Sequence, residues 1–349
     1  MNPSGLSLAR TRLGATPFEA LYRAVMQPGA TRETPGAWYR DWRVMRLDGT
    51  TLDVADTAAN REAFGRPASA RGVNATGAFP QLRLVGLVET GMHVLCGAAF
   101  GAYATGEVTL AAGVVSTLTP DMLCLADRGF VGFDLWQHAA TTGAALLWRV
   151  KAGVVLPVET RYADGSYRSA LRWNRHCRSA DRRPIPVRVI EYTLPGTPDA
   201  DTRYRLITTI LDPDRAPAAE LAALYHERWE IETTFDEFKT HLRGAQRVLR
   251  SKTPELVRQE AWGFLLAHFA LRALMHEAAL GARPHARDPD TLSFTHAVRV
   301  ARRTLPHRAA IPTSGSGAVA SDHSARAPRG TRALQPRTRR APRRKAQDE

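Results

Sequence analysis

Two short, nearly continuous apolar runs constrain the fold of this chain most. Met122–Ala126 (MLCLA) and Ala144–Val150 (AALLWRV) lack the polar–apolar alternation of a half-exposed strand. Between them, Phe133–Thr141 has the spacing of a helix. A strand is apolar throughout when helices cover both faces of its sheet. The sequence therefore predicts an α/β fold, a mixed sheet with helices packed on it.

Several segments before these runs extend the same pattern. Arg43–Leu47 is a short strand candidate, and Asp56–Ala75 is polar and typical of a loop. Phe79–Glu89 and Met92–Phe100 flank a Thr-Gly pair, which predicts a hairpin. Glu107–Leu118 has helical spacing, so the expected order is strand, hairpin, helix, buried strand, helix, buried strand.

After Lys151 the pattern changes. Val154–Tyr162 and Ser166–Trp173 flank Ala-Asp-Gly, a hairpin signal, and two more strand candidates follow at Pro186–Leu194 and Arg203–Ile210. A run of antiparallel strands over 152–212 thus interrupts the α/β pattern. Helices are then expected at the following places, with one more near the start of the chain: Ala216–Leu242, Pro254–Leu280, Phe294–Arg303 and Pro17–Met26.

These patterns divide the chain into five expected parts. Residues 41–151 and 213–305 form the two parts of an α/β core, and the β-rich insertion 152–212 lies between them. Residues 1–40 hold little more than one helix. Residues 306–349 are rich in Ser, Gly, Pro and Arg and are expected to be disordered.

The net charge of +14 favours a polyanionic partner such as nucleic acid. Much of this charge lies at the C-terminus, where Arg326–Lys345 holds nine basic residues and no acidic ones. Without residues 326–349 the chain has 39 basic and 32 acidic residues, so its body is only modestly basic. The tail is expected either to bind DNA phosphates non-specifically or to be inert.

Other classes of protein fit poorly. No apolar run approaches the ~18 residues that a membrane helix needs, and the N-terminus lacks the layout of a signal peptide. We therefore expect a soluble, cytoplasmic protein without a membrane partner. Cys96, Cys124 and Cys177 are widely spaced, which argues against disulfides and zinc. The histidines also lack the spacing of a metal site.

The stretch from Tyr225 to Lys239 places four functional-looking side chains on one helix face. On a wheel of ~100° per residue they share an arc of roughly 60°: Tyr225, Arg228, Glu232 and Lys239. An adjacent stripe is apolar and is expected in the core: Leu224, Ile231, Phe235, Phe238 and Leu242. The opposite side is expected to face water: Glu227, Glu230, Thr233, Glu237 and His241. The same spacing also suits an amphipathic helix with ordinary ion pairs four residues apart.

Two aspartates follow predicted strands. Asp48 comes after Arg43–Leu47, and Asp127 comes after the buried run Met122–Ala126. A carboxylate at the end of a strand in an α/β sheet lies at the edge where ligands bind. Each aspartate taken alone also suits a turn, in Asp-Gly or Asp-Arg-Gly.

The three carboxylates together indicate metal-dependent chemistry. Asp48, Asp127 and Glu232 repel one another at close range unless a cation lies between them. Oxygen ligands suit Mg²⁺ or Mn²⁺, and two such ions assist in-line phosphoryl displacement. The basic residues Arg128, Arg228 and Lys239 are candidates to hold backbone phosphates, and Tyr225 is also predicted to contact DNA. Lys151 suits either a contact with DNA or an ordinary solvated lysine at a strand end.

Other interpretations stay open. A hydrolase with two carboxylates as acid and base would need no metal, but it leaves the aligned Arg228 and Lys239 unexplained. Trp229 and Trp262 suit either stacking on an unpaired base or packing in the core.

At these residues the chain resembles the DDE transposases of the insertion-sequence-four type. Their helix signature is Tyr, two residues, Arg, three residues, Glu, six residues, Lys, and it is matched at every spacing from Tyr225 to Lys239. Three earlier blocks also resemble the family, in the same order: Leu47–Leu52 with Asn60 and Phe64-Gly65, Leu125–Phe130, and Leu147–Lys151.

The resemblance implies a ribonuclease-H-like fold with a β-rich insertion before the helix that bears Glu232. It implies a catalytic triad of Asp48, Asp127 and Glu232 and Mg²⁺-dependent nicking and strand transfer at the ends of an insertion sequence. The partners would be double-stranded DNA, both transposon ends and target, and a second copy of the chain. Only 47 residues precede Asp48, fewer than the family's helical N-terminal domain needs. We therefore expect residues 1–40 to be a remnant of that domain, and the alternative function is a truncated, catalytically silent DNA-binding protein.

Overall fold

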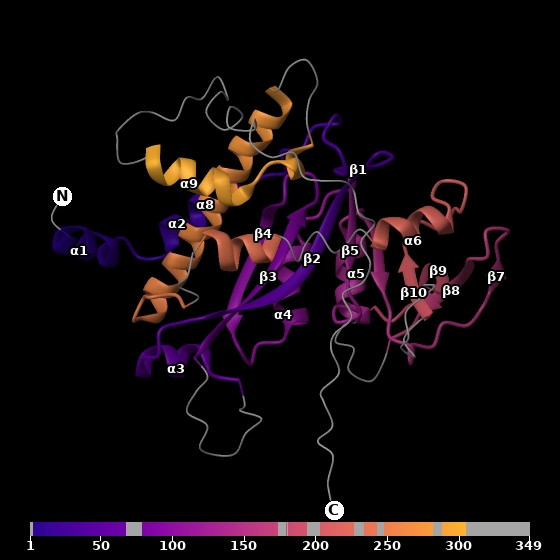
Figure 1. The fold of residues 1–349 in the computed structure, drawn as a ribbon. Helices are drawn as coiled ribbons and strands as arrows, with labels where there is room; N and C mark the ends of the chain where they lie inside the picture. Colours follow the sequence, from indigo (N-terminus) through magenta and orange to yellow (C-terminus); the bar gives the residue numbers. More distant parts are fainter. Residues whose placement is uncertain are drawn as a thin grey trace, which may run out of the picture.

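A computed structural model describes residues 3–67, 79–173, 179, 181–193, 203–226, 234–242, 248–281 and 288–304. Cys177 and the segment 306–349, which is predicted to be disordered, lie outside these residues. In Figure 1, the core of the described part is a single large twisted sheet with helices packed on it. No helix of the described part is long and apolar enough to cross a membrane.

The strands predicted before residue 152 form five neighbouring strands of the sheet, in the order β4-β3-β2-β5-β6. Their bounds are β2 Trp42–Asp53, β3 Gln81–Glu89, β4 Val94–Ala102, β5 Met122–Ala126 and β6 Ala145–Arg149. The pairs β2–β3 and β3–β4 are antiparallel, whereas β2–β5 and β5–β6 are parallel. This order and these directions are those of a ribonuclease-H-like sheet, so the predicted fold class is confirmed.

The β-rich stretch extends this sheet. Its strands are β7 Thr160–Arg161, β8 Tyr167–Leu171, β9 Ile185–Thr193 and β10 Arg203–Thr208. They continue from β6 in the order β10-β9-β8-β7, and β10 pairs antiparallel with β6. A two-residue strand, β1 (Trp38–Tyr39), pairs with β2. Three of the four strands predicted in 152–212 are therefore present in one sheet with the core, whereas only Thr160–Arg161 of the predicted strand Val154–Tyr162 is a strand.

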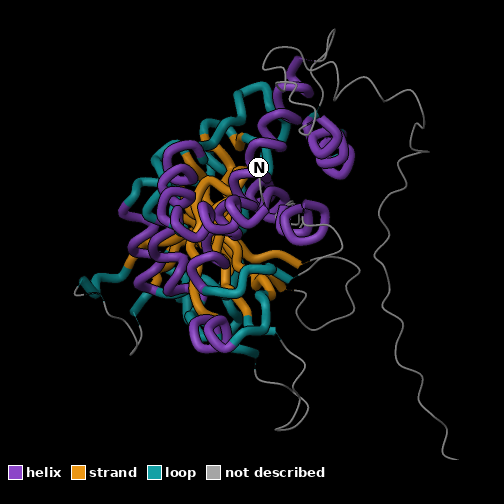
Figure 2. Tube along the Cα trace, turned by 90° about the vertical axis from the view of Figure 1, so that its left-hand side faces the viewer, coloured by secondary structure: helices purple, strands orange, loops and turns teal. Residues whose placement is uncertain are grey.

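Helices cover both faces of the sheet, as the turned view in Figure 2 shows. On one face, α4 (Glu107–Val115) and α5 (Phe133–Thr141) bury Trp136, which meets Trp148 of β6 edge to face at 5.1 Å between ring centroids. On the other face lie α6 (Ala218–His226) over β5 and β6, and α8 (Pro254–Gly281) over β3 and β4. The remaining helices are α1 Pro3–Leu13, α2 Thr16–Val25, α3 Ala58–Phe64, η2 Glu237–Leu242, η3 Pro289–Thr291 and α9 Phe294–Thr304.

The N-terminal helix α2 packs on α8, and the two lie beside α9 in Figure 1. Tyr22 of α2 is buried against Trp262 of α8, with ring centroids 4.7 Å apart. Trp262 is therefore a core residue and not a surface for stacking bases. The helix predicted at Pro17–Met26 is thus present as α2, although its Leu21 is 51% exposed.

The prediction of a loop over Asp56–Ala75 is wrong for Ala58–Phe64, which form α3. Thr57 caps this helix, because its hydroxyl accepts a hydrogen bond from the backbone N–H of Asn60 at 3.2 Å. The Asn60 side chain is buried and donates to the carbonyl oxygens of Ala55 and Ser251. These polar residues cap and anchor a helix, and their polarity alone does not distinguish that role from a loop.

Gly91 lies in the turn between β3 and β4, where backbone segments approach closely. A Cβ at this position would contact the Ala37 Cβ and would lie 2.9 Å from Thr34 Cγ2 and 3.1 Å from the Ala37 Cα. These groups are short and cannot swing away. We expect Gly91→Ala to lower the free energy of unfolding by about 1–3 kcal/mol, measured by urea titration. The control is Gly113→Ala in α4, where a Cβ meets nothing within 4 Å; equal losses in the two variants would contradict this packing.

Candidate active site

Asp48 and Asp127 lie on neighbouring parallel strands. The last registered pair between β2 and β5 is Leu47 with Ala126, and each aspartate is the next residue of its strand path. The prediction that the strand ends before Asp48 is wrong, because β2 continues to Asp53 through its antiparallel pairing with β3. Asp48 therefore lies within β2 and not at its end, but it lies beside Asp127 as predicted.

Strand alternation gives the face on which these carboxylates lie. Val44 and Leu125 pack in the cluster that contains α6, whereas Leu47 and Ala126 face α4 and α5. Asp48 and Asp127 follow Leu47 and Ala126, so continued alternation directs both toward the face covered by α6. Both residues are half-buried.

Each aspartate accepts a hydrogen bond from the next backbone N–H. The Asp48 Oδ1 accepts from Gly49 at 2.8 Å, and the Asp127 Oδ1 accepts from Arg128 at 2.6 Å. These bonds fix the two carboxylates relative to the backbone at this edge of the sheet.

Tyr225 ties the end of α6 to the end of β5. Its side chain is buried, and its hydroxyl donates to the carbonyl oxygen of Ala126 at 3.4 Å. The phenol thus lies one residue from Asp127 and holds α6 over this edge of the sheet. Its predicted contact with DNA stays a prediction, and the geometry gives it a packing role.

Arg228 and Glu232 lie outside the described residues, so their predicted positions are not tested. The chain is described again from Thr234, and the Phe235 ring reaches 3.7 Å from where a Cβ of Gly86 would lie. Gly86 is the cross-strand partner of Asp48. Tyr225 therefore lies beside Asp127, and Phe235 lies beside the partner of Asp48. The described residues on both sides of 227–233 lie over the sheet face of the two aspartates.

The helical wheel fails at Glu237. This residue was expected to face water, yet it is only 6% exposed, whereas Phe235 and Leu242 are buried as expected. Residues Glu237–Leu242 form the π-helix η2. A π-helix has more residues per turn than an α-helix. A wheel of ~100° per residue therefore assigns residues of η2 to the wrong side of the helix. Lys239 lies on η2 and is half-buried.

The other predicted basic residues lie at the same sheet edge. Arg128 directly follows Asp127, and Lys151 follows β6 by two residues; both are exposed. Because β5 and β6 are parallel with Ala126 opposite Trp148, the carboxyl ends of the two strands coincide. Positive side chains thus flank the edge that carries Asp127.

Sequence reasoning missed a cluster of aromatic and basic residues beside α6. The Arg149 guanidinium lies 4.1 Å from the centroid of the Tyr204 ring, which stacks on Tyr192 at 5.3 Å. His226, the last residue of α6, meets both rings edge-on, and burial together with Arg149 lowers its pKa. Arg149 ends β6, one residue beyond the partner of Ala126. Its place in the block LeuTrpArgVal was visible in the sequence, but its partners come from strands far along the chain.

The donor set suits a hard divalent cation. Asp48 and Asp127 offer carboxylate oxygens, which Mg²⁺ and Mn²⁺ prefer. Within the described ranges, no group of three or more His, Cys, Asp and Glu side chains is arranged to hold a metal. The third predicted carboxylate, Glu232, lies outside them. The chemistry of the two described carboxylates therefore fits the expected metal, and their role as ligands stays a prediction.

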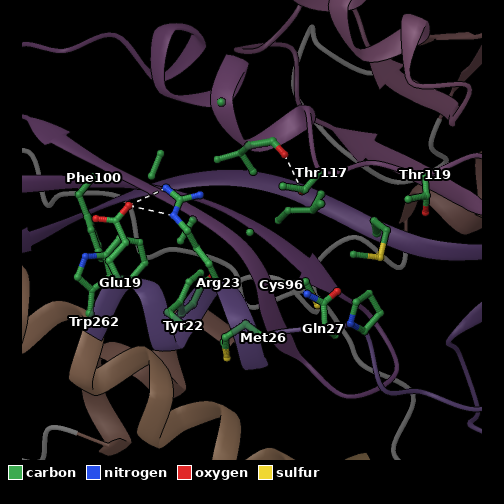
Figure 3. A pocket seen from close by; sticks show the side chains of 18 of the residues that line it. Glu19, Tyr22, Arg23, Met26, Gln27, Cys96, Phe100, Thr117, Thr119 and Trp262 are labelled. Carbon is green, nitrogen blue, oxygen red and sulfur yellow. Dashed lines mark hydrogen bonds and ion pairs between the residues drawn. The ribbon is translucent and has the colours of Figure 1, made fainter. Parts of the chain in front are cut away.

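Two other features are separate from this site. A cavity of about 500 Å³ lies between α2 and the edge strand β4, with Tyr22, Cys96, Phe100 and Trp262 in its wall (Figure 3). None of the predicted site residues lines it. The thiols of Cys96 and Cys124 are free, and burial raises the pKa of Cys124 to about 12, so this thiol is a core group.

Comparison with known protein families decides the assignment. The family model described as "Transposase DDE domain" matches residues 41–270. This chain belongs to the DDE transposase family. The match begins just before β2 and ends within α8, so it includes both aspartates and the Tyr225–Lys239 signature.

The curated relatives that this DDE transposase resembles include a transposase of insertion sequence element IS4. It is 28% identical over 308 residues to the transposase InsG for insertion sequence element IS4 of Escherichia coli (strain K12), covering 87% of this chain and 67% of InsG. It is 29% identical over 150 residues to the putative transposase InsZ of the same strain, covering 43% of this chain and 49% of InsZ. A solved piggyBac transposase synaptic complex with hairpin DNA aligns over 77% of this chain and 54% of its own, at a TM-score of 0.43 and 10% identity. The match to the family model confirms the resemblance to DDE transposases that was inferred from the signature.

Proposed function

We propose that this DDE transposase nicks DNA at the ends of an insertion sequence and joins the freed 3′ ends to a target, with Mg²⁺ or Mn²⁺. The observation that carries the proposal is the placement of Asp48 and Asp127 on adjacent parallel strands, under the helices that flank the Glu232 segment. A pair of acidic side chains at one edge, with positive side chains around it, suits a phosphodiester substrate.

In this proposal Asp48, Asp127 and Glu232 hold two divalent ions. When bound, such ions activate an attacking oxygen and stabilise the leaving oxygen of a phosphodiester. The protein's own side chains would position the DNA. Arg128 and Lys151 are exposed at the edge and would pair with phosphates on either side of the scissile bond.

The helix signature supplies the other positioning groups. Arg228 and Lys239 are proposed to hold the DNA backbone in line with the carboxylates. Tyr225 holds α6 against Ala126 and so keeps the start of this segment beside Asp127. The proposed substrate is double-stranded DNA, with transposon ends and target bound by two copies of the chain, and the basic tail over 306–349 adds non-specific affinity.

The test is a nicking assay with the purified chain. The substrates are labelled duplexes that carry the inverted-repeat ends flanking its own coding sequence, and the control duplex has those ends scrambled. With Mg²⁺ the end duplexes should be nicked at the element boundary to give a 3′ hydroxyl, and EDTA should stop the reaction. Binding of the ends without nicking, by protein whose fold is verified by circular dichroism, would contradict the proposal and favour the silent DNA-binding alternative.

A further inference from the structure

A buried cluster of charged side chains lies behind η2. Glu237 is its centre: the Arg272 Nε of α8 donates to the Glu237 Oε2 at 2.9 Å, and the Arg272 Nη2 donates to the Oε1. The His268 Nε2 lies 3.4 Å from the same Oε2. All three residues are at most 6% exposed. A two-pronged contact between a guanidinium and a carboxylate has a defined geometry, so it fixes η2 on α8 in direction as well as in distance.

The cluster continues to the turn between β3 and β4. The Arg272 Nη2 also contacts the His93 Nδ1 at 3.0 Å, and the His93 Nε2 lies 3.3 Å from Asp290 Oδ1. His93 has a φ of 56°, in the left-handed region that residues other than glycine seldom adopt. Such a conformation persists where the surrounding contacts hold it. The cluster therefore joins four segments that are far apart in the sequence: η2, α8, η3 and this turn.

The turn between β3 and β4 also contacts β2, the strand that carries Asp48. Thr90 precedes His93 in the turn and accepts a hydrogen bond from Arg46 Nε at 3.1 Å. Arg46 is buried and lies two residues before Asp48, on the same side of β2. The turn thus links β2 to the charged cluster, because its Thr90 contacts Arg46 of β2 and its His93 contacts Arg272 of α8.

The Glu237 carboxylate is charged in this cluster. Burial by itself would raise the pKa of Glu237, but the hydrogen bond with His268 and the charge of Arg272 outweigh burial and lower it. The carboxylate is therefore ionised and paired. Breaking one side of a buried ion pair leaves the other charge uncompensated, so the cluster tolerates little movement of η2.

We propose that Glu237 is a positioning residue for the transposase reaction: through Arg272 it fixes η2 so that Lys239 reaches the DNA backbone beside Asp48 and Asp127. The proposal rests on the proposed function. It goes beyond the helix signature, in which Glu237 has no part. Lys239 follows Glu237 by two residues on η2, and Phe235 precedes it by two and packs over Gly86, the partner of Asp48.

A double-mutant cycle tests the proposal. Turnover in Mg²⁺ and DNA affinity in EDTA are measured for the wild type, Glu237→Gln, Lys239→Ala and the double variant, at a temperature where all are folded. We expect Glu237→Gln to lower turnover about tenfold or more, since small misplacements of positioning groups have effects of this size. In a protein that already carries Lys239→Ala, Glu237→Gln should lower turnover only about twofold. Equal losses in both backgrounds would overturn the proposal.

The matched control is Glu89→Gln. Glu89 is also a fully buried partner of an arginine, Arg43, and it accepts hydrogen bonds from the backbone at Gly29 and Ala30. Both variants should lower the melting temperature, but only Glu237→Gln should lower turnover. A Glu237→Gln enzyme with wild-type turnover would also overturn the proposal.

The test also covers two other outcomes: a Glu237→Gln variant that does not fold and a wild type that does not nick DNA. If Glu237→Gln does not fold, Arg272→Lys takes its place, because lysine keeps the charge but loses the two-pronged contact. If the wild type fails to nick DNA, the proposed function is contradicted, and the cycle in DNA affinity still decides whether Glu237 acts through Lys239.

Discussion

Asp127→Asn is expected to reduce DNA nicking on the order of 10³-fold or more, as losses of essential catalytic groups do. An amide has nearly the same shape as a carboxylate, but it lacks the negative charge that a divalent cation requires. The Asn side chain can still accept the hydrogen bond that Arg128 donates to Asp127. Because Asp127 is half-buried, stability should change by no more than about 0.5 kcal/mol. Asp48→Asn should behave in the same way.

The control for Asp127→Asn is at the other end of the same strand. Asp121 is exposed, precedes β5 and accepts a hydrogen bond from Thr119 at 2.5 Å. Asp121→Asn should leave nicking within about twofold of the wild type, as for surface changes away from a site. The measurement is single-turnover nicking of end DNA in Mg²⁺, with urea titrations for stability. Similar activity in the two variants would remove Asp127 from the proposed metal site.

Glu232→Gln is expected to cause the second large loss, again on the order of 10³-fold in turnover. The resemblance gives Glu232 the third carboxylate, and glutamine keeps its size while removing its charge. The residue is predicted to act in catalysis, so the melting temperature should remain close to that of the wild type.

Glu230→Gln is the control for Glu232. The sequence predicts a helix here, and its wheel puts Glu230 on the side opposite Glu232, so this change should leave turnover unaffected. The alternative interpretation, an ordinary ion pair between Arg228 and Glu232, gives the opposite pattern: a small loss of stability, roughly 0.5 kcal/mol or less, and normal turnover. The two interpretations are therefore separated by one nicking assay and one melting curve.

The sheet could be predicted in outline because its strands have simple patterns. Met122–Ala126 is β5 residue for residue, since a strand covered on both faces leaves an unbroken apolar run. The end of β2 was missed, because Gly49 to Asp53 are mostly polar and their strand conformation depends on pairing with β3. The pairing of β10 with β6, which joins the insertion to the core sheet, is a long-range contact that no local pattern contains.

The candidate site was predictable in part for similar reasons. Motif order and spacing indicated Asp48 and Asp127, and the parallel register of β2 and β5 places them side by side. The burial of Glu237 was not predictable from an α-helical wheel, because the wheel does not describe the π-helix η2. The grouping of Arg149 with Tyr192 and Tyr204 requires knowledge of which strands neighbour β6.

The most direct test of a metal site at Asp48 and Asp127 is the metal preference of Asp127→Cys. A thiolate binds Mg²⁺ poorly but accepts softer ions such as Mn²⁺ more readily. Nicking of end DNA by this variant is measured in Mg²⁺ and in Mn²⁺, beside the wild type and Asp121→Cys. We predict that Asp127→Cys is inactive in Mg²⁺ and regains part of its activity in Mn²⁺, whereas Asp121→Cys follows the wild type. An Asp127→Cys enzyme as active in Mg²⁺ as the wild type would contradict the assignment of Asp127 as a metal ligand.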